Sequence, residues 1–564
     1  MPRALLAWLA AALLIVPLAC KRDATATHPT TLRFVRDGIV IPETKANFAG
    51  IGHTWTMMEI HHGITFGADL FLPWQGAPGD RIFTKQLGTT RVGRIPENPS
   101  PWTMATMPLE DVRAVTLTGN LADSCVAVAG TTVATGTYNG QLHVARIGEQ
   151  PRTISLATGG MVKCLGFNIE AKERPNPPDG TVQPDTLFVG EQTPRGRFRC
   201  LDVANLTERW GFDVATDLGE GMLPKPDDLY GIYALPGIFQ VVIRRDAVFF
   251  VGVHSFTDNT GTKINRSRLY AYKVDGTPMW AWPAAGPAPL NILRFALANG
   301  TLVLATSRSE EAAPDPVYQD RAVYVLDRTT GLERAHLQIP PLTNDTEAPF
   351  IWQSVGITGD GTIGAIGLSD GRGLLLELPQ ASDPTPQVRI RDTLDLGTPI
   401  ETAGVTLTAP VAYCLCTDTM CYFHTAGSNI PAGSSGSATT PPAPHPGANT
   451  LVAVDPYTGN TQWSYRDPTG FNGLFSDAGG RWLLTTTGNP LYPDQEGGYG
   501  ILLFDTQRTG EGAARIVWKQ PLDGAPFFNA AVSNDGFLIA VTETPVRNAD
   551  GVSFRGTFQT HVLH

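Results

Sequence analysis

Residues 451–463, LVAVDPYTGNTQW, decide how the rest of the chain is interpreted. LVAV is an apolar run of residues that favour strands. Asp455, Pro456 and Gly459 then favour a turn, because Pro fixes φ, Asp bonds its own backbone and Gly accepts a positive φ. A second short strand follows and ends on Trp463. The stretch therefore predicts a strand–turn–strand unit that ends on a large aromatic side chain.

Looser copies of this unit recur along the chain. Asp202 and Trp210 repeat the eight-residue step from Asp455 to Trp463. Other copies keep Gly276 with Trp280, Asp327 with Gly331, or Asp505 with a later Trp518, and a degenerate copy surrounds Glu377. Registered at 202, 273, 327, 377, 455 and 505, the copies include two steps of 50 residues, from 327 to 377 and from 455 to 505. A period near that length suits a four-stranded propeller blade.

We therefore predict an all-β fold, a single eight-bladed β-propeller of four-stranded antiparallel blades, with seven blades as the alternative. The earlier strands are expected at 112–118, 125–129, 132–137, 142–147 and 153–157. The segments 530–544 and 556–563 resemble a blade that lacks one strand, and 31–41 could supply it and close the ring. The propeller would span 31–564, with irregular cover at about 42–110 and a flexible Ser/Pro/Gly/Thr-rich loop at about 426–448.

The first residues, MPRALLAWLAAALLIVPLAC, have the pattern of a bacterial export signal. Arg3 precedes an apolar run that is too short to span a bilayer. The ending Leu18-Ala19-Cys20 resembles a lipobox, so we expect a signal peptide at 1–19, lipidation of Cys20 and a polar tether at 20–30. Pro17 departs from the usual pattern, which leaves a plain signal peptide as the alternative. Lys21 after the cysteine favours the outer membrane of a Gram-negative bacterium, with the protein on its periplasmic or cell-surface side.

Six further cysteines are expected to form disulfides or to be buried, because the compartment would be oxidising. The candidates are Cys125, Cys164, Cys200, Cys414, Cys416 and Cys421. We expect a local disulfide that involves Cys421, and no cysteine is expected to be catalytic. The run Cys414-Leu-Cys416-Thr-Asp-Thr-Met-Cys421 does not have the ligand spacing of a zinc site.

Composition and motifs restrict the chemistry. The net charge of −11 argues against nucleic-acid binding, which needs a basic face. His53, Glu59, His61 and His62 form a possible metal cluster, but their spacing is not HExxH and a surface loop is the favoured interpretation. The sequence contains no Gly-x-Ser-x-Gly elbow and no Walker loop. We therefore assign no catalytic, cofactor-binding or metal-binding residue.

The motif of an apolar strand, Ala453, Asp455, Thr458 and Gly459 followed by Trp463 resembles the repeat of the pyrroloquinoline-quinone (PQQ)-type propellers. That resemblance implies that the repeated Trp docks on the neighbouring blade, where a buried indole contributes a large apolar area. The residues expected in this structural role are Asp202, Trp210, Trp280, Asp327, Asp455, Gly459, Trp463, Asp505 and Trp518.

Two kinds of protein carry this repeat. The quinoprotein dehydrogenases bind PQQ with Ca²⁺ and often have a vicinal Cys-Cys pair, which this sequence lacks. The other kind is the non-catalytic propeller lipoprotein of the BamB type. The lipobox and the missing site motifs favour the second kind, a binding or scaffold module for envelope proteins that has no cofactor. A PQQ-dependent alcohol or sugar dehydrogenase and a carbohydrate-binding propeller are the alternatives.

Overall fold

The structure is a computed structural model of the 564-residue chain. It describes residues 32–36, 39–40, 81–86, 89–94, 111–116, 125–136, 140–146, 149, 151–156, 161–168, 183–222, 235–244, 247–257, 263–287, 291–307, 321–342, 349, 351–402, 405–426, 428–431, 445–467, 469–477, 479–487, 499–524, 526, 530–533, 536, 538–543, 546–547, 554–555 and 559–563.

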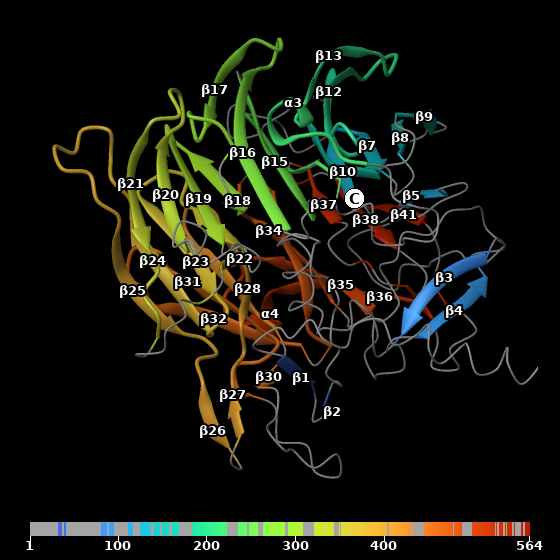
Figure 1. The fold of residues 1–564 in the computed structure, drawn as a ribbon. Coiled ribbons are helices and arrows are strands. Elements are labelled where there is room, and N and C mark those ends of the chain that lie inside the picture. Colours follow the sequence, from blue (N-terminus) through green and yellow to red (C-terminus); the bar gives the residue numbers. More distant parts are fainter. Residues whose placement is uncertain are drawn as a thin grey trace, which may run out of the picture.

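The described strands group into eight four-stranded antiparallel units, numbered here along the chain (Figure 1). Unit 1 is β6 (Cys125–Ala129), β7 (Thr132–Gly136), β8 (Gln141–Arg146) and β9 (Arg152–Ser155), and unit 2 is β10 (Met161–Phe167), β11 (Thr186–Gln192), β12 (Arg197–Asp202) and β13 (Glu208–Asp213). Unit 3 is β14 (Gly237–Arg244), β15 (Ala247–Thr257), β16 (Lys263–Lys273) and β17 (Pro278–Trp282), and unit 4 is β18 (Asn291–Ala298), β19 (Thr301–Ser307), β20 (Ala322–Asp327) and β21 (Glu333–Gln338).

The second half of the chain continues the pattern. Unit 5 is β22 (Ile351–Ile357), β23 (Ile363–Leu368), β24 (Arg372–Glu377) and β25 (Arg389–Asp395), and unit 6 is β28 (Val411–Cys416), β29 (Cys421–Thr425), β31 (Thr450–Val454) and β32 (Thr461–Arg466). Unit 7 is β33 (Phe471–Ser476), β34 (Trp482–Thr487), β35 (Tyr499–Asp505) and β36 (Ile516–Leu522), and unit 8 is β37 (Ala530–Val532), β38 (Ile539–Glu543), β41 (Gln559–Leu563) and β5 (Asp111–Thr116).

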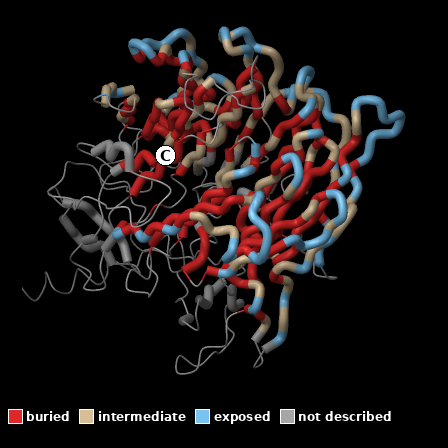
Figure 2. The backbone as a smooth tube through the Cα atoms, turned by 180° about the vertical axis from the view of Figure 1, so that it is seen from behind, coloured by how far each residue is buried: buried red, intermediate tan, exposed pale blue. Residues whose placement is uncertain are grey.

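These sheets confirm the predicted all-β propeller fold, while the number of blades in a closed ring stays a prediction. The first strand of a unit is innermost: the first strands of units 5 and 6 even pair in parallel, Gln353 opposite Tyr413. The second and third strands are almost wholly buried, whereas fourth strands such as β25 alternate between exposed and half-buried positions (Figure 2). The core therefore lies between successive units, as stacked sheets require.

Unit 8 is completed by an N-terminal strand other than the one we expected. β5 pairs with β41, Thr116 opposite Gln559. The expected closing segment, 31–41, instead contains β1 (Leu32–Arg36) and β2 (Ile39–Val40), and β1 pairs with β30 (Ser428–Pro431). Both N-terminal segments have residues that favour strands. Which of them pairs with β41 depends on where β41 lies in the folded chain, and the sequence does not show this.

Two other expectations need correction. The segment at about 42–110 was expected to be irregular, yet β3 (Arg81–Gln86) and β4 (Thr89–Arg94) form a hairpin within it. The loop at about 426–448 contains β30, which pairs with β1 and contacts β27. In both segments the many turn-favouring residues led us to expect no strand. The strands nevertheless form because each pairs with another strand: β3 with β4, and β30 with β1.

The two ends of the units differ. Connections between first and second strands and between third and fourth strands lie at one end, called here the turn end, where turns such as 299–300, 417–420 and 455–460 are short. The opposite loop end carries most of the long connections, including α3 (Ala215–Leu218) and the hairpin β26 (Ile400–Thr402) with β27 (Val405–Leu407), which extends away from the sheets (Figure 1). Further elements are α4 (Gly512–Arg515), in the turn-end connection between β35 and β36, and the hairpin of β39 (Val546–Arg547) with β40 (Phe554–Arg555).

Candidate functional site

The innermost strands of units 3 to 7 enclose a cavity of about 290 Å³. Its walls come from β14, β18, β22, β28 and β33, and the lining residues lie in the halves of these strands that run toward the turn end. The polar and charged side chains among the described lining residues are Gln240, Arg244, Arg294, Tyr413 and the sulfurs of Cys414 and Cys416. This central channel is the main candidate binding site of the molecule.

A repeated irregularity of the backbone places one residue per unit at the same level of the channel. In β18 the pairing with β19 shifts between Ile292 and Arg294, and β14 has the same shift before Gln240. A β-bulge re-aims the residue that follows it. The residues directly after the shift in units 2 to 7, called here the inner ring, are Cys164, Gln240, Arg294, Val355, Tyr413 and Gly473.

The inner ring carries one cation, Arg294, among neutral residues. Burial lowers the pKa of the Arg294 guanidinium, while Tyr413 and Cys164 act in the opposite direction. Even so, guanidinium groups stay protonated in proteins at neutral pH. Burial raises the pKa of the Tyr413 phenol and of the Cys164 thiol well above their usual ranges, so both stay neutral and keep their protons.

Two side chains of β14 hold the neighbouring inner strand in place. The Gln240 amide donates to the carbonyl oxygen of Phe295 at 2.9 Å and accepts from the Phe295 N–H at 3.0 Å. Arg244, closer to the turn end, donates to the carbonyl oxygen of Leu297 at 2.6 Å. Because Phe295 directly follows Arg294, these contacts fix the backbone of the strand segment that carries Arg294.

At the turn end, the repeated tryptophans cross from one unit to the next. The indole N–H of Trp210 donates to the carbonyl oxygen of Val274 in unit 3 at 2.9 Å, and that of Trp280 donates to Arg328 in unit 4 at 3.0 Å. Each indole lies over a turn glycine of the next unit: an added Cβ at Gly331 would lie 2.5 Å from the Trp280 ring. Gly331 also has φ of 71°, which disfavours other residues.

The remaining residues of the predicted structural set occupy equivalent places. Trp463 is 2% exposed and lies 5.7 Å from Phe504 of unit 7, centroid to centroid, with the Arg515 guanidinium 5.3 Å from the indole. Trp518 on β36 is 1% exposed. Asp455 accepts from the N–H groups of Tyr457 and Thr458, and Asp505 accepts from Gln507 and forms an ion pair with Arg481. Gly459, with φ of 73°, faces Asp392 of unit 5.

Sequence analysis missed an arginine that accompanies two of the repeated aspartates. Asp327 accepts from the N–H groups of Thr329 and Thr330 through one carboxylate oxygen and pairs with Arg334 through the other at 2.5 Å. Asp202 pairs with Arg209 in the same way at 2.6 Å. In both copies the arginine follows the aspartate by seven residues, and this repeated spacing could have revealed the pair from the sequence.

The Asp327 turn should make the free energy of unfolding depend on pH in the acidic range. Burial alone would raise the pKa of Asp327, but hydrogen bonds from Arg334 and Thr330 outweigh it, and the pKa is lowered. A lowered folded-state pKa contributes stability that is present above the unfolded value of about 3.9 and is lost as the pH falls through the folded value. For this half-exposed pair the loss is no more than about 1 kcal/mol. Urea midpoints of wild type and Asp327→Asn at pH 7 and pH 3 test it: the difference between the two proteins should be smaller at pH 3 than at pH 7, and a constant difference would contradict the assignment.

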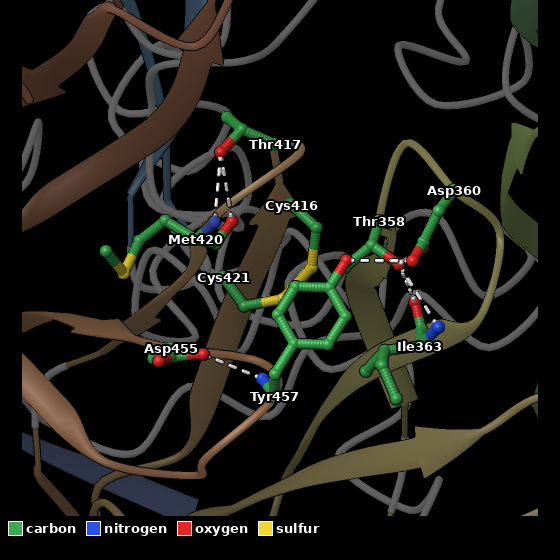
Figure 3. Close-up of a disulfide and its surroundings, with 9 residues drawn as sticks. All are labelled: Thr358, Asp360, Ile363, Cys416, Thr417, Met420, Cys421, Asp455 and Tyr457. Atoms are coloured by element: carbon green, nitrogen blue, oxygen red, sulfur yellow. Dashed lines mark hydrogen bonds between the residues drawn. A yellow bond between two sulfur atoms is a disulfide. The ribbon is translucent and has the colours of Figure 1, made fainter.

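Further bonds link the turns of units 4, 5 and 6. The Asn299 side chain donates to the carbonyl oxygen of Asp360 at 3.0 Å. From the other side, the Tyr457 hydroxyl donates to the Asp360 carboxylate at 3.0 Å, and Figure 3 shows the ring pointing toward that carboxylate. Asp360 is further held by the Thr358 hydroxyl at 2.6 Å. Three successive units are therefore joined through one aspartate.

The predicted local disulfide is confirmed: Cys416 and Cys421 are bonded across the β28–β29 turn (Figure 3). The other four candidates, Cys125, Cys164, Cys200 and Cys414, form no disulfide in the structure, so of the two expected states, paired or buried, Cys164, Cys200 and Cys414 adopt the buried one. Cys164 and Cys200 share one hydrophobic cluster with Phe188 and Phe198, whereas Cys125 and Cys414 each pack in another. Cys125 is half-buried and the other three are buried.

This arrangement predicts a labelling pattern. Iodoacetamide added to the unfolded protein without reductant should modify Cys125, Cys164, Cys200 and Cys414, whereas Cys416 and Cys421 should react only after reduction. Peptide mass spectrometry reads out each site. Modification of Cys416 before reduction, or protection of Cys164 or Cys200, would contradict the assignment.

Several predictions lie outside the described residues. Cys20, the signal peptide at 1–19 and the tether at 20–30 are among them, as are His53, Glu59, His61 and His62. Within the described ranges, no group of three or more His, Cys, Asp or Glu side chains is arranged to hold a metal ion. None of the helices in the described part of the chain combines the length and apolar character needed to cross a membrane.

The chain has weak likeness to known proteins. No protein-family model matches it, and no curated protein sequence does. It is similar to the solved structure of Sqt1 from Saccharomyces cerevisiae, with a TM-score of 0.45 and 10% identity over 82% of this chain and 98% of that one. It is also similar to BamB from Moraxella catarrhalis, with a TM-score of 0.40 and 11% identity over 81% and 98%, and to the β-propeller domain of Cps50 (Swd1) from Myceliophteria thermophila, with a TM-score of 0.38 and 8% identity over 81% and 99%. At these identities the likeness concerns the fold alone.

Proposed function

We propose that this protein is a non-catalytic binding module that presents the turn end of its propeller to a protein partner in the bacterial envelope. The observation that carries the proposal is the chain of side-chain contacts that fixes the turns of successive units. Trp210, Trp280, Asn299 and Tyr457 each bond to the turn of a neighbouring unit. A surface whose shape is fixed before binding loses little conformational freedom on association.

The turn end also exposes side chains suited to a partner. Leu332, in the turn after Asp327, is 69% exposed, and Tyr457 is 39% exposed. Aromatic side chains are enriched among the residues that dominate binding energy, and Tyr457 is held by its hydroxyl while its ring stays accessible. Leu332 and Tyr457 lie in the turns between the third and fourth strands of units 4 and 6.

The attachment to the envelope is part of the proposal. Lipidation of Cys20 would anchor the chain through two acyl chains, which is enough for stable attachment. The ten polar residues at 21–30 would then allow the propeller to turn relative to the membrane. We expect Cys20→Ala to release the protein from membranes and to abolish labelling by a fatty-acid analogue. Membrane sedimentation of Cys20→Ala, combined with an unlabelled wild type, would contradict the anchor.

Site-specific photocrosslinking in native envelopes tests the partner face. A benzophenone side chain at position 332 or 457 should give a discrete adduct with one protein. Met222, 89% exposed at the loop end, is the matched control and should give none. Tyr457→Ala should weaken the adduct at position 332 without changing the circular dichroism spectrum. Equal adducts from all three positions, or an adduct from 222 alone, would reject the turn end as the binding face.

The enzymatic alternative has its own test. Purified protein incubated with PQQ and Ca²⁺ should give no dye-linked oxidation of alcohols or sugars above the protein-free rate. Robust turnover would reject the non-catalytic proposal whatever the crosslinking shows.

A further inference from the structure

The disulfide between Cys416 and Cys421 closes a loop that hydrogen bonds already close. The two residues lie opposite each other in the β28–β29 hairpin, five positions apart in the sequence. Inside the loop, the Thr417 N–H donates to the carbonyl oxygen of Met420 at 2.8 Å. The Met420 N–H donates to the Thr417 hydroxyl at 3.2 Å (Figure 3). A disulfide stabilises mainly by restricting the unfolded chain, and the gain is smallest for short loops. The hairpin therefore depends little on this covalent bond.

The two cysteines of the disulfide have different surroundings. Cys421 is 0% exposed, and it belongs to the hydrophobic cluster between units 5 and 6. Cys416 packs against the same cluster but is only half-buried, and it is one of the residues that line the central channel. Because reactivity of a sulfur depends on access, a reagent in the channel would meet Cys416 and not Cys421.

A glycine of the neighbouring inner strand leaves room beside the Cys416 sulfur. Gly356 on β22 also lines the channel, and an added Cβ at this position would lie 2.7 Å from the Sγ of Cys416. Since glycine has no side chain, nothing at position 356 separates this sulfur from the channel. The cavity volume of about 290 Å³ is at the small end of ligand sites, which span roughly 300–1,000 Å³. The channel therefore suits a small molecule as the reagent.

The nearest cysteine in the sequence is not suited to open the disulfide from within. Cys414 lies two residues before Cys416 on β28 and also lines the channel. Burial raises the pKa of the Cys414 thiol well above its usual range. The thiolate, not the thiol, attacks a disulfide, so a thiol that keeps its proton is a poor nucleophile. The nucleophile would therefore come from outside the protein.

We propose that the Cys416–Cys421 disulfide is an exchange site, which a small-molecule thiol opens through the central channel. The thiolate of the small molecule attacks the Sγ of Cys416 and forms a new sulfur–sulfur bond there. The bond to Cys421 breaks, its electron pair stays on the Cys421 sulfur, and that sulfur takes up a proton. One disulfide replaces another, so the step has no net oxidation or reduction. The proposal goes beyond the protein-binding function and needs none of the residues on which that function rests.

A matched pair of serine variants tests which sulfur reacts. Cys421→Ser and Cys416→Ser each keep one thiol of the pair, and cystine probes it in the folded full chain, because attack of that thiolate on cystine leaves a mixed disulfide and releases cysteine. Peptide mass spectrometry after an acid quench reads out each site. Cys416 should be modified at least about tenfold faster than Cys421, since reactivity follows access. Equal rates at the two positions, or no modification of Cys416, would overturn the proposal.

The wild-type protein tests the reaction itself. Excess L-cysteine at about pH 8, where part of its thiol is ionised, should open the disulfide while the circular dichroism spectrum stays unchanged. The rate should be the same in water and in urea below the unfolding transition. A rate that rises with urea would show that the site reacts only after local unfolding, and a disulfide that persists would show that no thiol reaches it. Either result would overturn the proposal.

A glycine variant tests the route through the channel. Gly356→Ala places a methyl group against the Cys416 sulfur and should slow opening by L-cysteine several-fold or more. Gly300→Ala is the matched control, because nothing lies within 4 Å of its added Cβ, and it should react like wild type. An unchanged rate in folded Gly356→Ala would reject the channel as the route. If Gly356→Ala does not fold by circular dichroism, the serine pair and the urea series decide the proposal.

Discussion

Replacing Trp463 with alanine is expected to lower the free energy of unfolding by about 3–5 kcal/mol. The indole is 2% exposed and lies between Tyr422 of its own unit and Phe504 of the next, with Arg515 over its face. Truncation leaves a cavity at a boundary between two units, where the rigid sheets cannot collapse to fill it. Urea unfolding followed by circular dichroism measures the loss.

Trp463→Phe is the control for this variant. Phenylalanine keeps most of the apolar contact with Phe504, so its loss should be clearly smaller than that of alanine. A loss below about 1 kcal/mol for Trp463→Ala would contradict the structural role, because substitution of a fully buried tryptophan normally costs several times more.

Gly331→Ala is expected to cost about 2–5 kcal/mol, which is unusually large for the addition of one methyl group. Two causes add: the backbone has φ of 71°, and the new Cβ would lie 2.5 Å from the ring of Trp280. Gly300 isolates the first cause, since its φ is 79° and nothing lies within 4 Å of an added Cβ. Gly300→Ala should therefore cost only about 1–2 kcal/mol.

A double-mutant cycle isolates the second cause. In a Trp280→Ala background the collision disappears, so the additional cost of Gly331→Ala should fall to that of Gly300→Ala. Urea midpoints of the four proteins in the cycle provide the coupling energy. Additive costs would show that Trp280 does not contact this turn.

The sequence predicted the fold from its local signals. Asp327, Gly331 and Trp280 belong to tight turns and their neighbours, and such turns depend on residue types at fixed spacing. The disulfide between Cys416 and Cys421 was predictable for the same reason, because both residues flank one turn. The pairings of β1 with β30 and of β5 with β41 were not, since composition does not reveal which distant edge a strand will meet.

The candidate site was hidden from sequence analysis for a related reason. Arg294 and Tyr413 have no motif in common, and they meet only because a bulge occurs at the same place in their inner strands. A bulge is a property of the pairing between two strands, so a single strand sequence does not reveal it. Arg334 could be predicted in part. Its spacing from Asp327 can be read from the sequence, but only the structure shows that its guanidinium pairs with the Asp327 carboxylate.

The contact between units 1 and 8 has a consequence for synthesis. The Thr135 hydroxyl meets that of Thr560, 425 positions later, and Val133 and Ala145 share a cluster with Leu538 and Val562. At a translation rate of about 5–20 residues per second, the ribosome needs roughly 20–85 s to make the intervening chain. Throughout that interval Val133 and Ala145 lack the contacts that Leu538 and Val562 later provide. We therefore expect unit 1 to complete its packing only after the C-terminal strands of unit 8 have been made.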